Sequence, residues 1–189
     1  MKIAVILGSV REIRRGERVS KWLMIQLSKI KEAEFELLDL RDYPLPFYYE
    51  DNSPDSLENG YTNDVATKWA AKIKEADGFM MITPEYNHGP NAVLKNALDW
   101  VYNEWNKKPV TFVGYATGAG GAIRAVEQLR EIAVGLEMAP IKSALFISHV
   151  LDTIGEEGNL LKGTYNEQLP KVIKQILWWA EALRTAREK

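Results

Sequence analysis

The segment from Met81 to Trp100, MITPEYNHGPNAVLKNALDW, constrains the fold most, because it joins a buried strand to a polar turn and then to a helix. The apolar run 79–82 is typical of a strand buried on both faces of a parallel sheet. We expect Thr83 and Pro84 to end this strand, since proline cannot donate to a sheet ladder. Pro90 is expected in the first turn of the helix, where its missing N–H is not needed. Helical spacing predicts an inward face made of Val93, Leu94, Ala97, Leu98 and Val101.

The turn from Glu85 to His88 occupies the position where open α/β folds bind their ligands, at the carboxyl end of a central parallel strand. An ordinary polar connection between strand and helix would have a similar composition. This segment alone does not distinguish a ligand site from an ordinary connection, so the other loops of the chain are needed.

Strands and helices are predicted to alternate along the whole chain, which indicates a parallel sheet covered on both faces with right-handed crossovers. We expect one domain, residues 1–189, with an α/β doubly wound sheet of five strands in the order 2-1-3-4-5. The other predicted strands are Lys2–Leu7, Phe35–Leu40, Val110–Gly114 and Ile141–Val150. The last two helices are predicted to turn Ile123, Val126, Leu129 and Ile132, and residues of Pro170–Leu183, inward.

Composition excludes several classes of function. The 189 residues contain no cysteine and only two histidines, His88 and His149, so disulfides, cysteine-ligated metals and multi-histidine zinc sites are excluded. We therefore expect no metal. A formal net charge of −2 argues against nucleic acid as a partner. The apolar run of the first strand, Ile3–Leu7, is preceded only by Met1 and Lys2 and is too short for a signal peptide or membrane span, so we expect a cytoplasmic protein with no membrane contact.

The loop from Gly8 to Arg18 follows the first strand and has the outline of an anion site. It contains a hydroxyl, four arginines and a second glycine just before a helix. A helix N-terminus presents free N–H groups to a phosphate, and arginine adds a bidentate fork. The loop matches neither a Walker motif nor a dinucleotide fingerprint. A solvated arginine-rich loop is the alternative.

A second glycine-rich turn, Thr117 to Gly121, follows the fourth predicted strand. Ile123 stands where a dinucleotide fingerprint needs its third glycine, so that motif is excluded. The glycines would let backbone N–H groups approach a flat or anionic ligand, although tight packing of strand and helix would also explain them. The long segment Asp42–Asn59 would either wall a substrate entrance, meet a neighbouring subunit or pack on the domain as a surface loop.

Three segments, GSVREIRRGERVSKWL, PEYNHGPNAVLKNALDW and GYATGAGGAIRAVEQLR, together resemble the NAD(P)H-dependent FMN reductases of flavodoxin-like fold, a group that includes quinone, azo and chromate reductases. The resemblance covers nearly the whole chain. It implies an enzyme that takes hydride from NADPH or NADH on bound FMN and reduces flavin, quinone or related small acceptors in a ping-pong cycle. No side-chain acid, base or nucleophile is obligatory in such a reaction, because the flavin carries the hydride.

The resemblance also assigns residues to the cofactor. The loop that matches the FMN phosphate site contains Ser9, Arg11, Arg15, Gly16 and Glu17. The turn that would lie along the flavin ring contains Pro84, Glu85, Tyr86, Asn87 and His88. The turn near the pyrimidine end contains Thr117, Gly118, Gly120 and Gly121. Family members commonly carry serine where Gly118 stands, which leaves Thr117 as the candidate hydroxyl. His88 would either donate a proton to a quinone or have a capping or structural role.

Two other functions fit a flavin-binding chain: a flavodoxin-type electron carrier, and a regulatory module without turnover. The arginines of the first loop and the small net charge favour the reductase over the carrier. We also expect a homodimer or homotetramer, because Trp100, Trp105, Trp178 and Trp179 are too many large aromatics for one core.

Overall fold

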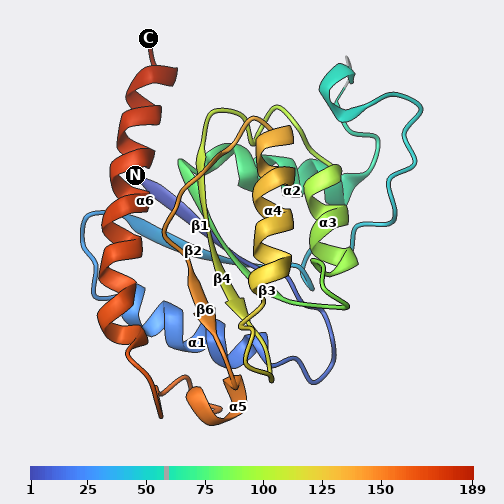
Figure 1. Cartoon of the computed structure of the whole chain (residues 1–189). Helices are drawn as coiled ribbons and strands as arrows, with labels where there is room; N and C mark the ends of the chain where they lie inside the picture. Colours follow the sequence, from blue (N-terminus) through green and yellow to red (C-terminus); the bar gives the residue numbers. More distant parts are fainter. Residues whose placement is uncertain (58–59) are drawn as a thin grey trace.

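The computed structural model describes residues 1–57 and 60–189 as a parallel sheet between two layers of helices (Figure 1). The last two residues of the predicted loop Asp42–Asn59, Glu58 and Asn59, lie outside the described residues. The strands are β1 (Lys2–Leu7), β2 (Glu34–Asp39), β3 (Gly78–Pro84), β4 (Pro109–Tyr115), β5 (Ala139–Pro140) and β6 (Leu145–Ile147). The helices are α1 (Gly16–Leu27), α2 (Asp64–Glu75), α3 (Ala92–Asp99), α4 (Ile123–Gly135), α5 (Val150–Thr153) and α6 (Tyr165–Arg187), with a short 3₁₀ helix at Pro54–Ser56.

The sheet order is β2-β1-β3-β4-β5, which confirms the predicted doubly wound topology. Every residue of β3 and β4 is buried, as the continuous apolar runs predict for central parallel strands. One core joins the sheet to α2, α3 and α4, and a second core joins its other face to α1 and α6. This arrangement brings the ends of β1, β3 and β4 to one edge of the sheet.

The central strand ends at Pro84, as predicted, although Thr83 and Pro84 still pair with Gly114 and Tyr115 of β4. Proline lacks a backbone N–H, so it fits the end of the ladder rather than its middle. The predicted place of Pro90 was wrong. Asn91 caps α3 by accepting a hydrogen bond from the N–H of Leu94 at 3.0 Å, so Pro90 precedes the helix.

The predicted fifth strand, Ile141–Val150, was largely wrong. Only β6 lies within these bounds, because β5 precedes them and Val150 begins α5. β5 and β6 both pair with β4, and the segment between them leaves the ladder. There the Thr111 hydroxyl donates to the carbonyl of Ser143 at 2.6 Å, while the N–H of Ser143 donates to the Gln175 side chain at 2.8 Å. Side chains thus replace the backbone bonds that a continuous strand would make.

Several predicted inward positions are exposed, and two predicted surface positions are buried. Val93 and Ile123 are 36% and 48% exposed. Trp100 and Trp105 are fully buried, whereas Trp178 and Trp179 are exposed as predicted, at 65% and 36%. Trp100 is covered because the loop after β2 folds back onto α3. Its indole donates to the carbonyl of Pro46 at 2.6 Å, and the rings of Tyr48 and Tyr49 pack against it. In the described part of the chain, no helix combines the length and apolar character that crossing a membrane requires.

Candidate active site

Three loops at the carboxyl ends of β1, β3 and β4 enclose a cavity of about 180 Å³. Seven of the predicted site residues line it: Ser9, Arg11, Arg15, Pro84, Glu85, Tyr86 and Thr117. Four residues that the sequence did not indicate also line it: Arg14, Tyr115, Ala116 and Val150. The other predicted residues lie outside its wall: Gly16, Glu17, Asn87, His88, Gly118, Gly120 and Gly121.

The arginines of the first loop differ in what they bind. Arg14 is almost fully buried and forms a bidentate ion pair with Asp39 at the end of β2. Arg18 pairs with Glu156 at 2.7 Å. Arg11 and Arg15 form no ion pair with any residue that the structure describes. They line the cavity just before the first turn of α1, where unpaired N–H groups favour an anion.

Tyr115 closes the base of the cavity at the end of β4. It is only 4% exposed, and burial raises the pKa of its phenol above the usual value. A Cβ atom added to Gly16 would lie 2.6 Å from the Tyr115 hydroxyl and 3.0 Å from Leu7 Cδ1. Gly16 is therefore needed for this close approach. Glu17, beside it, is about half exposed and lies 3.7 Å from Arg14 Nε.

Glu85 binds the start of α4 rather than the centre of the cavity. Its carboxylate accepts from Arg124 Nε at 2.6 Å and from the backbone N–H groups of Arg124 and Ala125 at 3.1 and 3.4 Å. Burial alone would raise the pKa of Glu85, but these hydrogen bonds outweigh it and hold the pKa below its ordinary value. Glu85 is thus a carboxylate that caps a helix.

The turn after Glu85 is a tight reversal held by its backbone. The N–H of Tyr86 donates to the carbonyl of Gly89 at 2.9 Å, and the return bond is 3.0 Å. Asn87 and His88, between them, have φ values of 50° and 70°. The carbonyl of His88 accepts from the Gln128 side chain at 2.8 Å. The Tyr86 hydroxyl lies 3.3 Å from Ser9 Oγ, which links this turn to the first loop.

The glycines of the third loop have different environments. Gly121 has a φ of 55°, and a Cβ there would lie 2.8 Å from the backbone of Phe146, so this glycine serves packing. A Cβ at Gly118 would meet nothing within 4 Å, and one at Gly120 would meet only the end of Arg124 at 3.8 Å. Both glycines, like Thr117, are exposed beside the cavity. Their backbone is open to a flat ligand.

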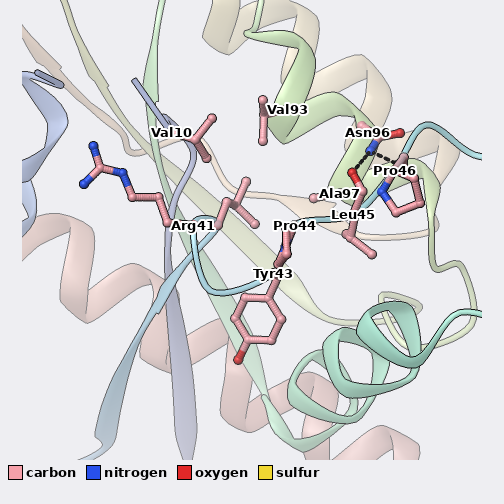
Figure 2. A pocket seen from close by; sticks show the side chains of 10 residues that line it. Val10, Arg41, Tyr43, Pro44, Leu45, Pro46, Val93, Asn96 and Ala97 are labelled. Atoms are coloured by element: carbon pink, nitrogen blue, oxygen red, sulfur yellow. Dashed lines mark hydrogen bonds between the residues drawn. The ribbon is translucent and has the colours of Figure 1, made fainter. Parts of the chain in front are cut away.

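A larger hollow of about 420 Å³ lies beside the first loop, between the loop after β2 and α3 (Figure 2). Its walls are mainly apolar, with Val10, Leu45, Pro46 and Val93 among them, and Asn96 donates to the carbonyls of Leu45 and Pro46. Arg41 is the cation in its lining. The smaller cavity differs from this hollow because it contains Arg11 and Arg15, which pair with no carboxylate in the described part of the chain, and lies at the start of α1.

Together, the topology and the cavity at the strand ends define the class of doubly wound α/β proteins, which bind their ligands at this edge of the sheet. Comparison with known protein families shows which of them this chain belongs to. Residues 1–152 match the family model of NADPH-dependent FMN reductases, and the chain belongs to this family. It is therefore an oxidoreductase of the type that uses FMN and NAD(P)H.

Individual relatives agree with this assignment. An NAD(P)H-dependent FMN reductase of Schizosaccharomyces pombe is 40% identical over 146 residues, which cover 76% of this chain and 72% of that protein. The NADPH:quinone oxidoreductase of Arabidopsis thaliana is 31% identical over 185 residues, covering 93% and 90% of the two chains. Among solved structures, FerB, an NAD(P)H:(acceptor) oxidoreductase from Paracoccus denitrificans, superposes with a TM-score of 0.79 at 24% identity and covers 96% of this chain and 97% of its own. The last comparison supports the flavodoxin-like fold alone.

Proposed function

We propose that the first loop holds the phosphate of FMN and that the turns at 84–88 and 117–121 hold its ring. The observation that carries this proposal is that Arg11 and Arg15, beside the start of α1, pair with no carboxylate among residues 1–57 and 60–189. Ser9 adds a hydroxyl from the cavity wall. Gly16 and Glu17 contribute through the first turn of α1, whose N–H groups face an anion.

The size of the cavity agrees with this division. Ligand pockets usually measure roughly 300–1,000 Å³, so a cavity of about 180 Å³ suits the phosphate end of the cofactor better than the whole of it. The ring would lie across the open mouth, along the backbone of Glu85 to His88 and of Thr117, Gly118 and Gly120. Gly121 would shape the third turn from behind, because it packs on β6.

FMN supplies the hydride chemistry when it is bound, so the task of this chain is to hold one edge of the ring and leave a face open. The exposed turns at the mouth leave room for a planar donor or acceptor. We propose that NAD(P)H and a small acceptor such as a flavin or quinone use this open face in turn, in a ping-pong cycle. Backbone N–H groups near Gly118 and Gly120 would stabilise negative charge at the pyrimidine end of the ring.

We also propose that residues 1–189 act as one FMN-binding domain in the cytoplasm and that the protein is a homodimer or a dimer of dimers. Buried Trp100 and Trp105 do not support the association, but other side chains do. Large apolar groups are exposed around the mouth and the neighbouring hollow: Val10, Phe47, Tyr86, Val93 and Ile123. Such a concentration marks an interface, and a partner there would cover part of each flavin site.

Replacing Arg11 tests the phosphate assignment. Arg11→Ala should weaken FMN binding about ten- to a hundredfold, the value of one charged hydrogen bond. Riboflavin, which lacks the phosphate, should bind the variant and the parent protein alike. Arg184→Ala, which removes an arginine on the far end of α6, is the matched control. Unchanged FMN affinity in Arg11→Ala would show that this loop does not hold the phosphate.

A further inference from the structure

Asp39, at the end of β2, organises two arginines around the first loop. Its carboxylate accepts hydrogen bonds from both terminal nitrogens of the Arg14 side chain, one of them at 2.6 Å, and from the backbone N–H of Arg41 at 3.0 Å. The Arg14 and Asp39 side chains are 5% and 19% exposed. Asp39 does not line the cavity itself. It therefore acts on the site only through the residues that it holds.

Both arginines bind carbonyl groups of the loop. Arg14 donates to the carbonyl of Ser9 at 2.9 Å. Arg41 donates through one nitrogen to the carbonyl of Arg11 and, at 2.9 Å, to that of Glu12. Three of the four carbonyls from Ser9 to Glu12 are thus bound by two guanidinium groups. Asp39 anchors the guanidinium of Arg14 directly and holds Arg41 by its backbone N–H.

The direction of these carbonyls sets the direction of the amides. In a trans peptide the N–H of the next residue points opposite to the C=O, and the described residues contain no cis peptide. The N–H groups of Val10, Glu12 and Ile13 are therefore turned away from the arginines. Within the described part of the chain, no N–H from Ser9 to Arg15 donates to a backbone or side-chain acceptor. A row of such free amides forms an anion-binding concavity.

We infer that Asp39 is a positioning residue for the FMN phosphate: through the side chain of Arg14 and the backbone of Arg41 it keeps the loop carbonyls occupied and leaves the loop amides free for the anion. This inference rests on the proposed function. It also predicts that removal of the Asp39 charge changes FMN affinity in the direction opposite to the one that simple electrostatics predicts. Removing a negative charge near a phosphate should strengthen binding by Coulomb's law, whereas loss of the anchor should weaken it.

The test compares FMN and riboflavin affinities of the purified apoprotein for Asp39→Asn, which preserves the shape of the side chain. We expect the FMN dissociation constant to rise at least about tenfold, the value of one charged hydrogen bond, with riboflavin affinity within about twofold of the parent. Turnover at saturating FMN should be unchanged, because the ring contacts stay intact. Glu36→Gln, on the same strand but paired with Lys2 and Lys72, is the matched control and should leave both affinities unchanged.

Two further variants keep the test decisive if Asp39→Asn unfolds. Arg41 is exposed, so Arg41→Gln should fold and should also weaken FMN selectively. Arg14→Lys keeps the charge but loses the fork, and should weaken FMN to a similar extent and non-additively with Asp39→Asn. Equal or tighter FMN binding by Asp39→Asn and Arg41→Gln would overturn the inference. A parent protein that binds riboflavin as tightly as FMN would instead refute the phosphate site itself.

Discussion

Glu85 holds the start of α4 and has no role as a proton donor. It lies on the turn proposed to follow the flavin ring, a position where a carboxyl group could act as an acid. Arg124 and two amides of α4 bind it instead and lower its pKa. A carboxyl group that stays ionised well below neutral pH is a poor acid at pH 7.

Glu85→Gln should therefore keep most of the turnover per bound flavin while it lowers stability by about 1 kcal/mol, the usual value of a helix cap. Because the folded-state pKa is lowered, the stabilisation by Glu85 is complete above its ordinary pKa of 4.5 and is lost as the pH falls through the folded-state pKa. In thermal unfolding, the difference in melting temperature between the parent and Glu85→Gln should therefore be larger at pH 7 than at pH 4. A variant that still holds FMN but has lost its activity would show that Glu85 is catalytic.

The sequence indicated Arg11 and Arg15 correctly as members of the cavity wall, because their position after the first strand is enough to place them there. It did not indicate Arg14, which has the same residue type in the same loop. What distinguishes Arg14 is Asp39, 25 residues further along the chain and on the neighbouring strand. Partners of that kind depend on sheet register, which residue spacing does not reveal.

At the scale of elements, the reversal at 86–89 carries its strain in Asn87 and His88. Their φ values lie in the left-handed region, which glycine adopts most easily and which asparagine and histidine tolerate better than most other residues. Gly89 itself has an ordinary φ, and a Cβ there would meet only the end of Gln128 at 3.1 Å.

His88→Gly should therefore raise stability by roughly 1 kcal/mol and retain bound flavin, because glycine adopts this conformation freely. His88→Val should lower flavin content, since a β-branched residue resists a positive φ. Flavin content, melting temperature and quinone reduction of the two variants form the measurement. If His88→Gly holds FMN but no longer reduces a quinone, then the imidazole donates a proton and the backbone account of this turn is wrong.

The central strands were predictable from apolar runs, but the exact extent of the pairing was not. Thr83 and Pro84 end β3 as predicted and nevertheless still pair with β4. The segment after β5 has the composition of a strand and leaves the ladder, because the Thr111 hydroxyl and the Gln175 side chain take the backbone partners. Both differences arise from tertiary contacts that local propensity does not contain.

For the whole molecule, alternation of strands and helices was enough to predict a parallel sheet covered on both faces. The strand order also required the known arrangement of doubly wound sheets with ligand loops after the first, third and fourth strands. The position of the tryptophans was not predictable in the same way. Trp100 is buried by a loop that starts at the end of β2 and returns to α3, a contact across 54 residues of sequence. The same fold leaves Phe47 80% exposed beside that loop, so the loop both packs on the domain and presents an apolar side chain outward.

Association should depend on that exposed region. We expect light scattering of the parent protein at micromolar concentration to give a dimer or tetramer. Val93→Glu, which places a charge between the mouth and the neighbouring hollow, should shift the mass to a smaller species and weaken flavin binding. Trp178→Ser, on the exposed face of α6, is the comparison and should leave the flavin affinity unchanged. A parent protein that stays monomeric would contradict the proposed interface.

The absorption spectrum of the purified protein, loaded with FMN and titrated with NADPH or NADH without oxygen, tests whether the chain works as an FMN reductase. We predict the two bands of oxidised flavin in the near-ultraviolet and blue, their loss on addition of the nicotinamide, and their return when a quinone is added. A protein that binds FMN but is not bleached by either nicotinamide, or that binds no flavin at all, would contradict it.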